Sequence, residues 1–548
     1  MLRFESAALA AAHFLEDLNK FMAGDMRSMV LSRLPRFLSA ALYLSAGMIL
    51  PMPAWSAPET PISEAHISNA DRQSWIFREA MASMDGRYDP AVGLLRGTVL
   101  SSSHPVSHPI RESSWYAFGL MMRNGPSDQQ RAEHILDVIL DNQYPVRDGT
   151  DHEAPWAGSF RRSPDELLPT EKAVAWKEYD PNWREFIGCE FALTLHVFGS
   201  RLHPELRQRL HESIRQAVQG ELHNRRLLSS YTNIAIMFGQ LLDEDAVYRR
   251  DRVMAGIREK WIHDTVAIFR QNQSFMEYNS PTYYGVDLFG LGLWRRYGST
   301  TFMKSSGDDI SRRLWLDIAT FYSAPMKNLA GPYDRAYGMD MESYVALVGD
   351  WIGTVVPRSK APLPATITVD TPHLADLWFA PTFVFLKATL PASIGNDFLT
   401  LTQPHDLTRR IDSSRSVSAR VDTNFLAGGE TAHLQRGVDA RSQYHPLAVQ
   451  WRASCGQVGT LRISDTPAAD VTIERGQALV SWKDHVTFAL HDPCPDTLKV
   501  DRNFWEAGNM QIQVRTDAAS SSHASDHKDV VIHYERGHFS KMVFKVLR

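Results

Sequence analysis

Apolar side chains between residues 70 and 355 recur every three or four positions, which is the spacing of an amphipathic helix. In the segment 204–226 the apolar positions lie four residues apart, and charged side chains fill the opposite face. Similar stripes predict further helices over 71–84, 111–123, 127–142, 184–199, 231–243, 246–270, 282–296, 308–323 and 340–354. About ten helices joined by loops fit antiparallel pairs arranged as a solenoid or an incomplete (α/α) toroid.

The pattern changes after a proline-containing stretch, 358–364, which we interpret as a linker. Beyond it, short runs alternate apolar and polar residues between turn residues, as is typical of antiparallel sheet. These runs are 416–421, 447–451, 478–482, 486–490, 512–514 and 530–534. The polar stretch 518–528 indicates a loop. We therefore predict a multidomain α and β protein, with an (α/α) toroid over 57–357 and an antiparallel β-sandwich over 365–548.

The beginning of the chain has the pattern of an export signal. Three arginines within 27–36 precede an apolar run at 37–50 and then small residues, which match the three regions of a signal peptide. We predict that the leader 1–56 is removed and that the protein is periplasmic or secreted. The residues in front of this signal are acidic, which is unusual there, so we expect translation to start at Met26 or Met29. No later apolar segment is long enough to span a bilayer, so we expect no membrane partner after signal removal.

Composition adds limits but no function. A chain of 548 residues exceeds what one hydrophobic core usually serves, which agrees with two domains. The formal net charge of -5 is small, and without a basic tract or motif we expect no nucleic-acid partner. Cys455 and Cys494 both fall in the predicted sandwich and could pair in an oxidising compartment, although their spacing leaves this open. Cys189 lies in a helical stripe, where a buried thiol acts as a small hydrophobe.

Candidate chemistry concentrates in the stretch 273–287, which places Glu277, Asn279 and three tyrosines around Pro281. Proline suits the first turn of a helix, so this stretch is interpreted as a loop that enters a helix. Phenols beside an amide and a carboxylate suit sugar recognition and proton transfer. The segments 179–185 and 331–340 share this character, so we predict a carbohydrate-active enzyme whose site lies at the ends of several helices.

The element Pro181-Asn182-Trp183, taken with the tyrosine and arginine motifs, resembles the (α/α)-toroid polysaccharide lyases. Hyaluronate, chondroitin AC and xanthan lyases, alginate lyases and heparinases belong to this group. The resemblance implies a toroid with a β-sandwich that cleaves a uronic-acid polysaccharide by β-elimination. Among the uronic acids we expect glucuronate, a choice that the resemblance does not make. The chain departs from the hyaluronate and chondroitin lyase pattern after Trp183, where Arg184 replaces a second aromatic residue.

β-Elimination requires donors that neutralise the uronate carboxylate, a base for the C5 proton and an acid for the departing oxygen. The resemblance implies that Asn182 and Arg335 serve the carboxylate and that a tyrosine carries protons. Adjacent helical residues point in different directions, so only one of Tyr283 and Tyr284 is expected to face the cleft, and we prefer Tyr284. The structural alternatives are a helix cap for Asn182, packing for both tyrosines and a local salt bridge for Arg335.

Two further residues complete the predicted catalytic set: Tyr337, which follows Arg335, and His445, which a loop of the sandwich would bring to the cleft. Other polar and aromatic residues near the three segments, or in separate loops, are predicted to contact substrate. They are Trp183, Glu277, Asn279, Asn233, Tyr333, Trp156 and His108. Packing, capping or other structural roles are the alternative for each of them.

Two other functions compete with the lyase interpretation. An inverting glycoside hydrolase would use Glu277 with Asp334 or Asp340 as its paired carboxylates. A non-catalytic exopolysaccharide-binding or assembly protein would keep the aromatic residues alone. The grouping of Asn, Tyr and Arg favours elimination, because a hydrolase does not require it.

We expect no cofactor and no metal. Some such lyases use a structural or substrate-bridging calcium, but the chain carries no acidic loop of the required spacing. The oligomeric state stays open.

Overall fold

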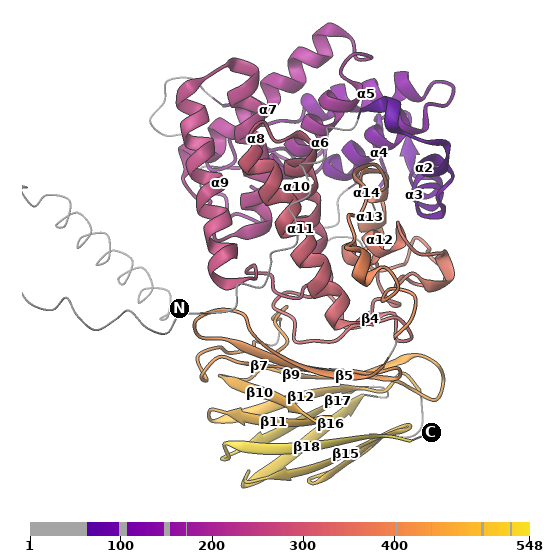
Figure 1. The fold of residues 1–548 in the computed structure, drawn as a ribbon, viewed down its shortest axis with the longest axis vertical. Helices are drawn as coiled ribbons and strands as arrows, with labels where there is room; N and C mark the ends of the chain where they lie inside the picture. Colours follow the sequence, from indigo (N-terminus) through magenta and orange to yellow (C-terminus); the bar gives the residue numbers. More distant parts are fainter. Residues whose placement is uncertain are drawn as a thin grey trace, which may run out of the picture. The chain divides into compact units, whose positions relative to one another are not determined.

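The structure is a computed structural model that describes residues 63–97, 107–146, 154–170, 172–401, 403–439, 441–494, 498–526 and 529–547. The chain from Ala57 to Arg548 forms one compact unit, and the predicted leader 1–56 lies outside the described residues. Helices make up the first part of the described chain and antiparallel strands the second, so the predicted fold class is confirmed (Figure 1). Within these ranges no helix combines the length and the apolar character needed to cross a membrane.

The helical region contains short and long helices. In chain order they are α2 (Asn69–Gln73), α3 (Trp75–Asp85), α4 (Ile110–Arg123), α5 (Asp128–Leu140), α6 (Trp183–Phe198), α7 (Pro204–Asn224), α8 (Thr232–Arg249), α9 (Arg252–Asn272), α10 (Tyr283–Tyr297), α11 (Thr301–Phe321), α12 (Leu347–Gly353), α13 (Leu374–Leu377) and α14 (Ala380–Leu386). The helix predicted over 340–354 begins only at Leu347. Asp340 holds the preceding residues in a turn, because its Oδ1 accepts a hydrogen bond from the Glu342 N–H at 2.9 Å.

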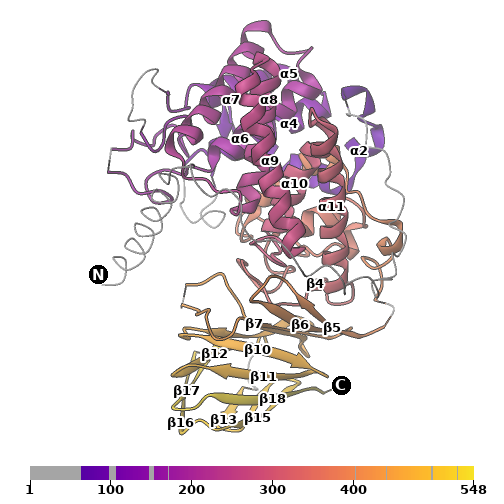
Figure 2. The same cartoon turned by 60° about the vertical axis from the view of Figure 1, so that its left-hand side comes forward.

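These helices form a ring of pairs. In chain order α4 packs on α5, α6 on α7, α8 on α9 and α10 on α11, and the last of these pairs can be followed in Figure 2. The first helix of each pair also contacts the first helix of the next, and α14 contacts both α10 and α4, which closes the inner ring. Inner helix α8 is buried on all sides from Thr232 to Asp243, whereas outer helix α7 buries a stripe that includes Leu206, Leu210 and Ile214. A helix that is buried all round belongs in an interior, so these patterns distinguish the inner helices from the outer ones.

The helical region extends further than the sequence predicts. The expected linker 358–364 contains a 3-10 turn (Arg358–Lys360), and Arg358 donates to Glu79 of α3 at 3.0 Å. Helices α13 and α14 follow, and the first strand of the large sheets begins only at His405. The predicted start of the sandwich at residue 365 is therefore corrected. Helices of four and seven residues are too short to show a hydrophobic period, which explains the error.

The strands form two large antiparallel sheets. The eight-stranded sheet has the order β16-β17-β12-β9-β8-β7-β6-β5 and the six-stranded sheet the order β10-β11-β18-β15-β14-β13. The bounds are β5 (His405–Arg410), β6 (Ser416–Val421), β7 (Phe425–Thr431), β8 (Leu447–Arg452), β9 (Val458–Ser464), β10 (Ala469–Glu474), β11 (Gln477–Trp482), β12 (His485–His491), β13 (Lys499–Asp501), β14 (Phe504–Ala507), β15 (Met510–Thr516), β16 (Ser520–Asp526), β17 (Asp529–Glu535) and β18 (Phe539–Val546). Two short hairpins lie among the helices: β1 (Tyr88–Asp89) with β2 (Leu94–Leu95), and β3 (Tyr322–Ser323) with β4 (Asn328–Leu329). The stretch 518–528, predicted as a loop, contains strand β16, which pairs along β17 at the sheet edge.

The eight-stranded sheet is buried on both faces at its centre. Leu426 and Ala448 pack into the core of the helical region, while their neighbours Ala427 and Val449 pack into the core between the two sheets. Strands β7 and β8 are consequently buried along almost their whole length. One face of the sheet therefore serves the sandwich and the other serves the helices.

The loop before α12 is fixed to this sheet. Tyr333 and His445 exchange backbone hydrogen bonds, and the Asp334 carboxylate accepts hydrogen bonds from Arg415, at 2.7 Å, and from Arg436. The loop also lies close to β7, where a Cβ added at Gly428 would fall 1.7 Å from the Gly331 carbonyl oxygen. Glycine is required at that close approach. These contacts determine where the next residue, Arg335, is placed.

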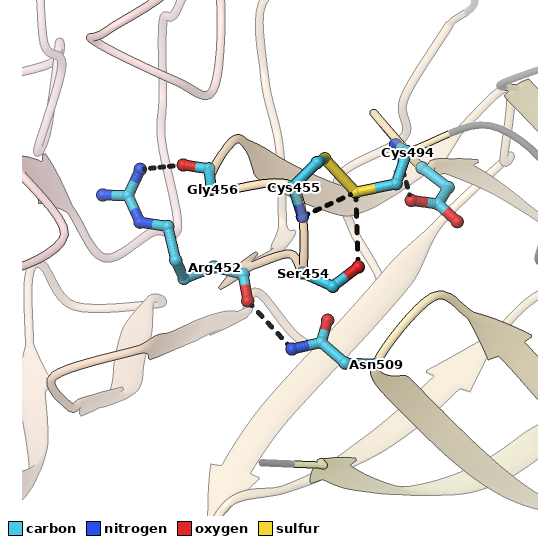
Figure 3. Close-up of a disulfide and its surroundings, with 7 residues drawn as sticks. Arg452, Ser454, Cys455, Gly456, Cys494 and Asn509 are labelled. Carbon is cyan, nitrogen blue, oxygen red and sulfur yellow. Dashed lines mark hydrogen bonds between the residues drawn. A yellow bond between two sulfur atoms is a disulfide. The ribbon is translucent and has the colours of Figure 1, made fainter.

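A disulfide joins Cys455 and Cys494, a pairing that the sequence left open (Figure 3). It connects the turn between β8 and β9 to the segment that follows β12. Cys189 is a buried free thiol, as predicted.

Candidate active site at the inner helix ends

Four inner helices direct their N-terminal turns at one cavity of about 590 Å³. Its lining includes Arg111 of α4, Trp183 of α6, Asn233 of α8 and Tyr283 of α10. The first turn of a helix has backbone N–H groups without intrahelical partners and carries the positive end of the helix dipole. Four such ends around one space favour a negatively charged ligand.

Tyr283 and Arg335 contact each other in this cavity. Arg335 Nη2 donates a hydrogen bond to the Tyr283 hydroxyl at 2.6 Å, and the guanidinium carbon lies 3.7 Å from the centre of the tyrosine ring. The Tyr337 hydroxyl lies 2.6 Å from the same oxygen. Burial and the neighbouring Tyr337 raise the pKa of Tyr283 well above its usual value, and Arg335 opposes this shift. Tyr283 is therefore a neutral phenol, beside a cation that stabilises its anion.

Asn182 and Asn233 bring two side-chain amides to the cavity. Asn182 Nδ2 donates to the Tyr231 hydroxyl at 3.2 Å, and Asn233 Nδ2 donates to Glu277 Oε1 at 3.0 Å. The Oδ1 atom of each amide is buried and has no hydrogen-bond partner among the described residues. Asn182 precedes α6 but makes no capping hydrogen bond, and the residue at the N-cap of α8 is Tyr231. Neither asparagine side chain therefore caps a helix, which was the structural alternative for both.

Glu277 lies behind this amide and does not line the cavity. It is fully buried, accepts hydrogen bonds from Asn233 and Thr232, and lies 4.0 Å from Arg335 Nη1. Burial raises its pKa, while the Thr232 hydrogen bond and the charge of Arg335 lower it. Glu277 thus positions Asn233 and Arg335, and the predicted substrate contact is corrected.

Trp183 lines the cavity in a cluster that the sequence did not predict. The Arg111 guanidinium lies 5.5 Å from its ring, 5.2 Å from that of Trp115 and 5.1 Å from that of Phe186. Glu112 accepts a hydrogen bond from Arg111 at 2.6 Å. A cation held among aromatic faces is positioned by the rings and remains charged. In the sequence, the available signal for Arg111 was its position in the first turn of a predicted helix.

His373 and Asp376 were also missed, because α13 was assigned to the sandwich. His373 has a left-handed backbone (φ 57°), and its ring stacks on Tyr337 with 4.3 Å between centroids. Burial lowers the pKa of His373 to about 4, so its imidazole is uncharged. Burial raises the pKa of Asp376 to about 7, against the opposing charge of Arg111. The Nδ1 atom of His373 lies 3.7 Å from Asp376 Oδ2.

Our preference for Tyr284 over Tyr283 is corrected. Tyr284 is fully buried, and its hydroxyl donates to Asp317 Oδ2 at 3.2 Å, outside the cavity lining. The two side chains leave α10 in different directions, as adjacent helical residues must. Tyr283 is the one that enters the cavity.

Asn279 and Tyr333 support the loop before α12 and do not contact the cavity. Asn279 Nδ2 donates to the Ala330 carbonyl at 2.7 Å and the Pro332 carbonyl at 2.9 Å. The Tyr333 hydroxyl donates to the Leu329 carbonyl and accepts from Gln450. Both predicted substrate contacts are replaced by structural roles.

Trp156 and His108 also lie outside the cavity lining. Trp156 packs in a small buried cluster, with its ring centre 6.0 Å from that of Tyr179. His108 Nε2 lies 3.3 Å from an Asp89 carboxylate oxygen, on the loop just before the cavity residue Pro109.

His445 does not join Tyr283. It lines a second cavity of about 970 Å³, and only 4% of its surface is exposed. Burial and the nearby Arg462 lower the pKa of His445 to about 3. Asp340 lines this second cavity too, while Asp334 is occupied by Arg415 and Arg436. The carboxylate pairs proposed for a hydrolase are therefore absent from the lining of the first cavity.

The fold and site define a helical toroid with a C-terminal antiparallel β-sandwich and an anion-attracting cavity at its inner helix ends. The chain belongs to the family described as "Domain of unknown function (DUF8769)", which matches residues 74–388.

No curated protein sequence matches this chain. Among solved structures, a mutant chondroitin AC lyase of Streptomyces coelicolor A3 is 11% identical, with 88% of this chain and 80% of that chain covered and a TM-score of 0.38. Heparinase III is 9% identical, with 89% and 87% covered and a TM-score of 0.42. Another heparinase III is 10% identical, with 90% and 87% covered and a TM-score of 0.35. These similarities are too distant to assign an activity.

Proposed function

We propose that the protein is an exported polysaccharide lyase that cleaves a uronic-acid polymer, with glucuronate as the acidic sugar, by β-elimination. The supporting observation is that four helix N-termini meet Arg335, Arg111 and the phenol of Tyr283 in one cavity. Helix N-termini and guanidinium groups attract carboxylates, and a phenol can transfer a proton. The Cys455–Cys494 disulfide supports the oxidising compartment, periplasmic or extracellular, that export implies.

In this proposal the uronate carboxylate is held by Arg335 and by the second N–H of the Asn182 and Asn233 amides, the first being used by Tyr231 and by Glu277. They stabilise the negative charge that develops as C5 loses its proton. The uncharged imidazole of His373 takes that proton. The bond between C4 and the glycosidic oxygen then breaks as the C4–C5 double bond forms, and the Tyr283 hydroxyl protonates the departing oxygen. Arg335 stabilises the phenolate that remains.

Ultraviolet absorbance tests the reaction directly. The chain from Ala57 to Arg548 would be incubated with glucuronans, alginate, glycosaminoglycans and xanthan-like polymers. Rising absorbance from a conjugated unsaturated uronate identifies a lyase and its substrate class. New reducing ends without that absorbance identify a hydrolase. If both signals are absent and the protein still binds a polymer, the non-catalytic binding function is supported instead.

Asn182→Ala is expected to lower kcat by about a hundredfold, the usual cost of removing one anion-stabilising donor. The side chain makes no capping hydrogen bond, so the helix should be little affected. Turnover of the best polymer and the thermal unfolding midpoint would be measured together. Turnover close to that of the unaltered chain would remove Asn182 from the proposed mechanism.

A second candidate function is an inverting glycoside hydrolase built on a carboxyl group that the sequence did not suggest. Asp376 lines the first cavity, and burial raises its pKa to about 7, so it can act as a general acid. Asp180 and Glu112 line the same cavity and could activate water.

For a hydrolase, Asp376→Asn should abolish the release of reducing ends. The activity of the unaltered chain should fall as the pH rises through about 7, because the acid form of Asp376 is then lost. For the lyase, the same substitution should leave most of the unsaturated product. Release of reducing ends against pH, with and without the substitution, distinguishes the two functions.

A further inference from the structure

The second cavity, of about 970 Å³, lies between the loop that precedes α12 and the strands β8, β9 and β12. Its lining is rich in basic side chains, and these are Arg441, Arg452, Arg462, His445 and His491. Two acidic residues, Asp340 and Glu342, line it as well. Arg452 and Lys327 form ion pairs with Glu342, at 2.9 Å and 3.1 Å, so the charge of Glu342 is already neutralised.

Two of these arginines have donors to spare. Within the part of the chain that the structure describes, the guanidinium groups of Arg441 and Arg462 make no hydrogen bond and no ion pair. Burial lowers the pKa of Arg462, and the charge of Asp529 opposes this shift. His445 Nδ1 is buried beside them and has no partner there either. A guanidinium has five donors and no acceptor, so it suits a planar anion such as a carboxylate or a sulfate.

The rim of this cavity is covalently held. Gly456 and Pro493 line it, and each is next to one cysteine of the disulfide in the sequence. Figure 3 shows Gly456 beside Cys455. Arg452 donates to the Gly456 carbonyl at 3.0 Å, and Asn509 Nδ2 donates to the Arg452 carbonyl at 3.1 Å. A binding site held in this way loses little conformational entropy when a ligand enters.

The two cavities are neighbours. Tyr337 and Gln443 line both of them, and Arg335 Nε donates to Gln443 Oε1 at 3.3 Å. We propose that the second cavity binds an anionic group of a saccharide, through Arg462 and Arg441, so that one acidic polymer chain occupies both cavities. The occupancy of both cavities rests on the proposed lyase function, whereas anion binding in the second cavity does not.

The test is calorimetric binding of glucuronate oligosaccharides, a disaccharide and a hexasaccharide, to the chain from Ala57 to Arg548. Arg462→Gln is expected to raise the hexasaccharide Kd about tenfold, the scale of losing a hydrogen bond to a charged group, and Arg441→Gln to act in the same direction. The disaccharide Kd should stay unchanged, because the first cavity holds it. Arg515→Gln, on an exposed position of β15 outside this lining, is the matched control and should change neither Kd.

Arg462→Lys keeps the charge and should recover part of the affinity, which separates binding from a general loss of structure. A sulfated hexasaccharide measured in parallel shows whether carboxylate or sulfate is the preferred anion. Unchanged hexasaccharide Kd in both glutamine variants overturns the proposal, even if the polymer is cleaved. Arg462-dependent binding without cleavage of any polymer overturns the lyase function and leaves the anion site standing.

Discussion

Tyr283→Phe is expected to lower kcat by about a thousandfold, the scale of losing a general acid, while the fold and polymer binding persist. The substitution removes the hydroxyl that meets both Arg335 and Tyr337 at 2.6 Å. The ring stays, and with it the contact that packs the guanidinium against its face. Production of unsaturated uronate would be measured together with the Kd of the polymer.

Tyr284→Phe is the matched control. It removes a hydroxyl from the next residue of α10, one that bonds to Asp317 away from the cavity. It should cost about 1 kcal/mol of stability and leave turnover intact. If Tyr284→Phe proved inactive and Tyr283→Phe active, the assignment of the two tyrosines would be reversed.

The proposed mechanism assigns the two proton transfers to different residues, and the variant Tyr283→Phe can separate them. His373 removes the C5 proton, so Tyr283→Phe should still exchange that proton with solvent deuterium, although it no longer breaks the glycosidic bond. Nuclear magnetic resonance of the recovered polymer would detect the exchange. Loss of both exchange and cleavage would make Tyr283 the base as well as the acid.

Arg335→Lys is expected to lower kcat by about a hundredfold or more, because lysine keeps the charge but lacks the planar fork of donors. Arg335 donates to Tyr283 through Nη2 and to Gln443 through Nε, and one ammonium group cannot meet both acceptors in the same geometry. Arg335→Ala should lose more, since the charge that opposes the raised pKa of Tyr283 is also gone.

The control for this series is Arg475→Lys, in the exposed turn between β10 and β11, which should behave like the unaltered chain. Steady-state kcat and KM on the same polymer would be compared across the three variants. An Arg335→Lys enzyme with unchanged kcat would show that Arg335 has only a structural role beside Tyr283.

The main elements of the fold could be predicted because long helices and alternating strands leave a period in the sequence. The segments 111–123 and 204–226 correspond to α4 and α7 within two residues. The short helices α13 and α14 show no such period, and the missed strand β7 is buried on both faces, so it lacks alternation. Strand β16 is missed for the opposite reason, because Ser521 to Ser525 are exposed and polar.

The site could be predicted only where its residues gather in short segments. Asn182, Tyr283, Arg335 and Tyr337 come from three such segments, and the structure brings them into one cavity. The choice between Tyr283 and Tyr284 failed because α10 is buried almost all round, so no apolar stripe shows which side faces inward. His373 stands alone in the sequence, and its role depends on the ring of Tyr337 beneath it.

The ion pairs of Asp334 with Arg415 and Arg436 limit where the chain can be cut into fragments. The family match ends at residue 388, but Arg415 and Arg436, which hold the Asp334 carboxylate, lie beyond it. A fragment cut there would lose both cations and the Gln443 contact of Arg335. The matched segment is therefore not an interchangeable module: on a different sheet, it would need matching arginines to hold Asp334 and so to place Arg335.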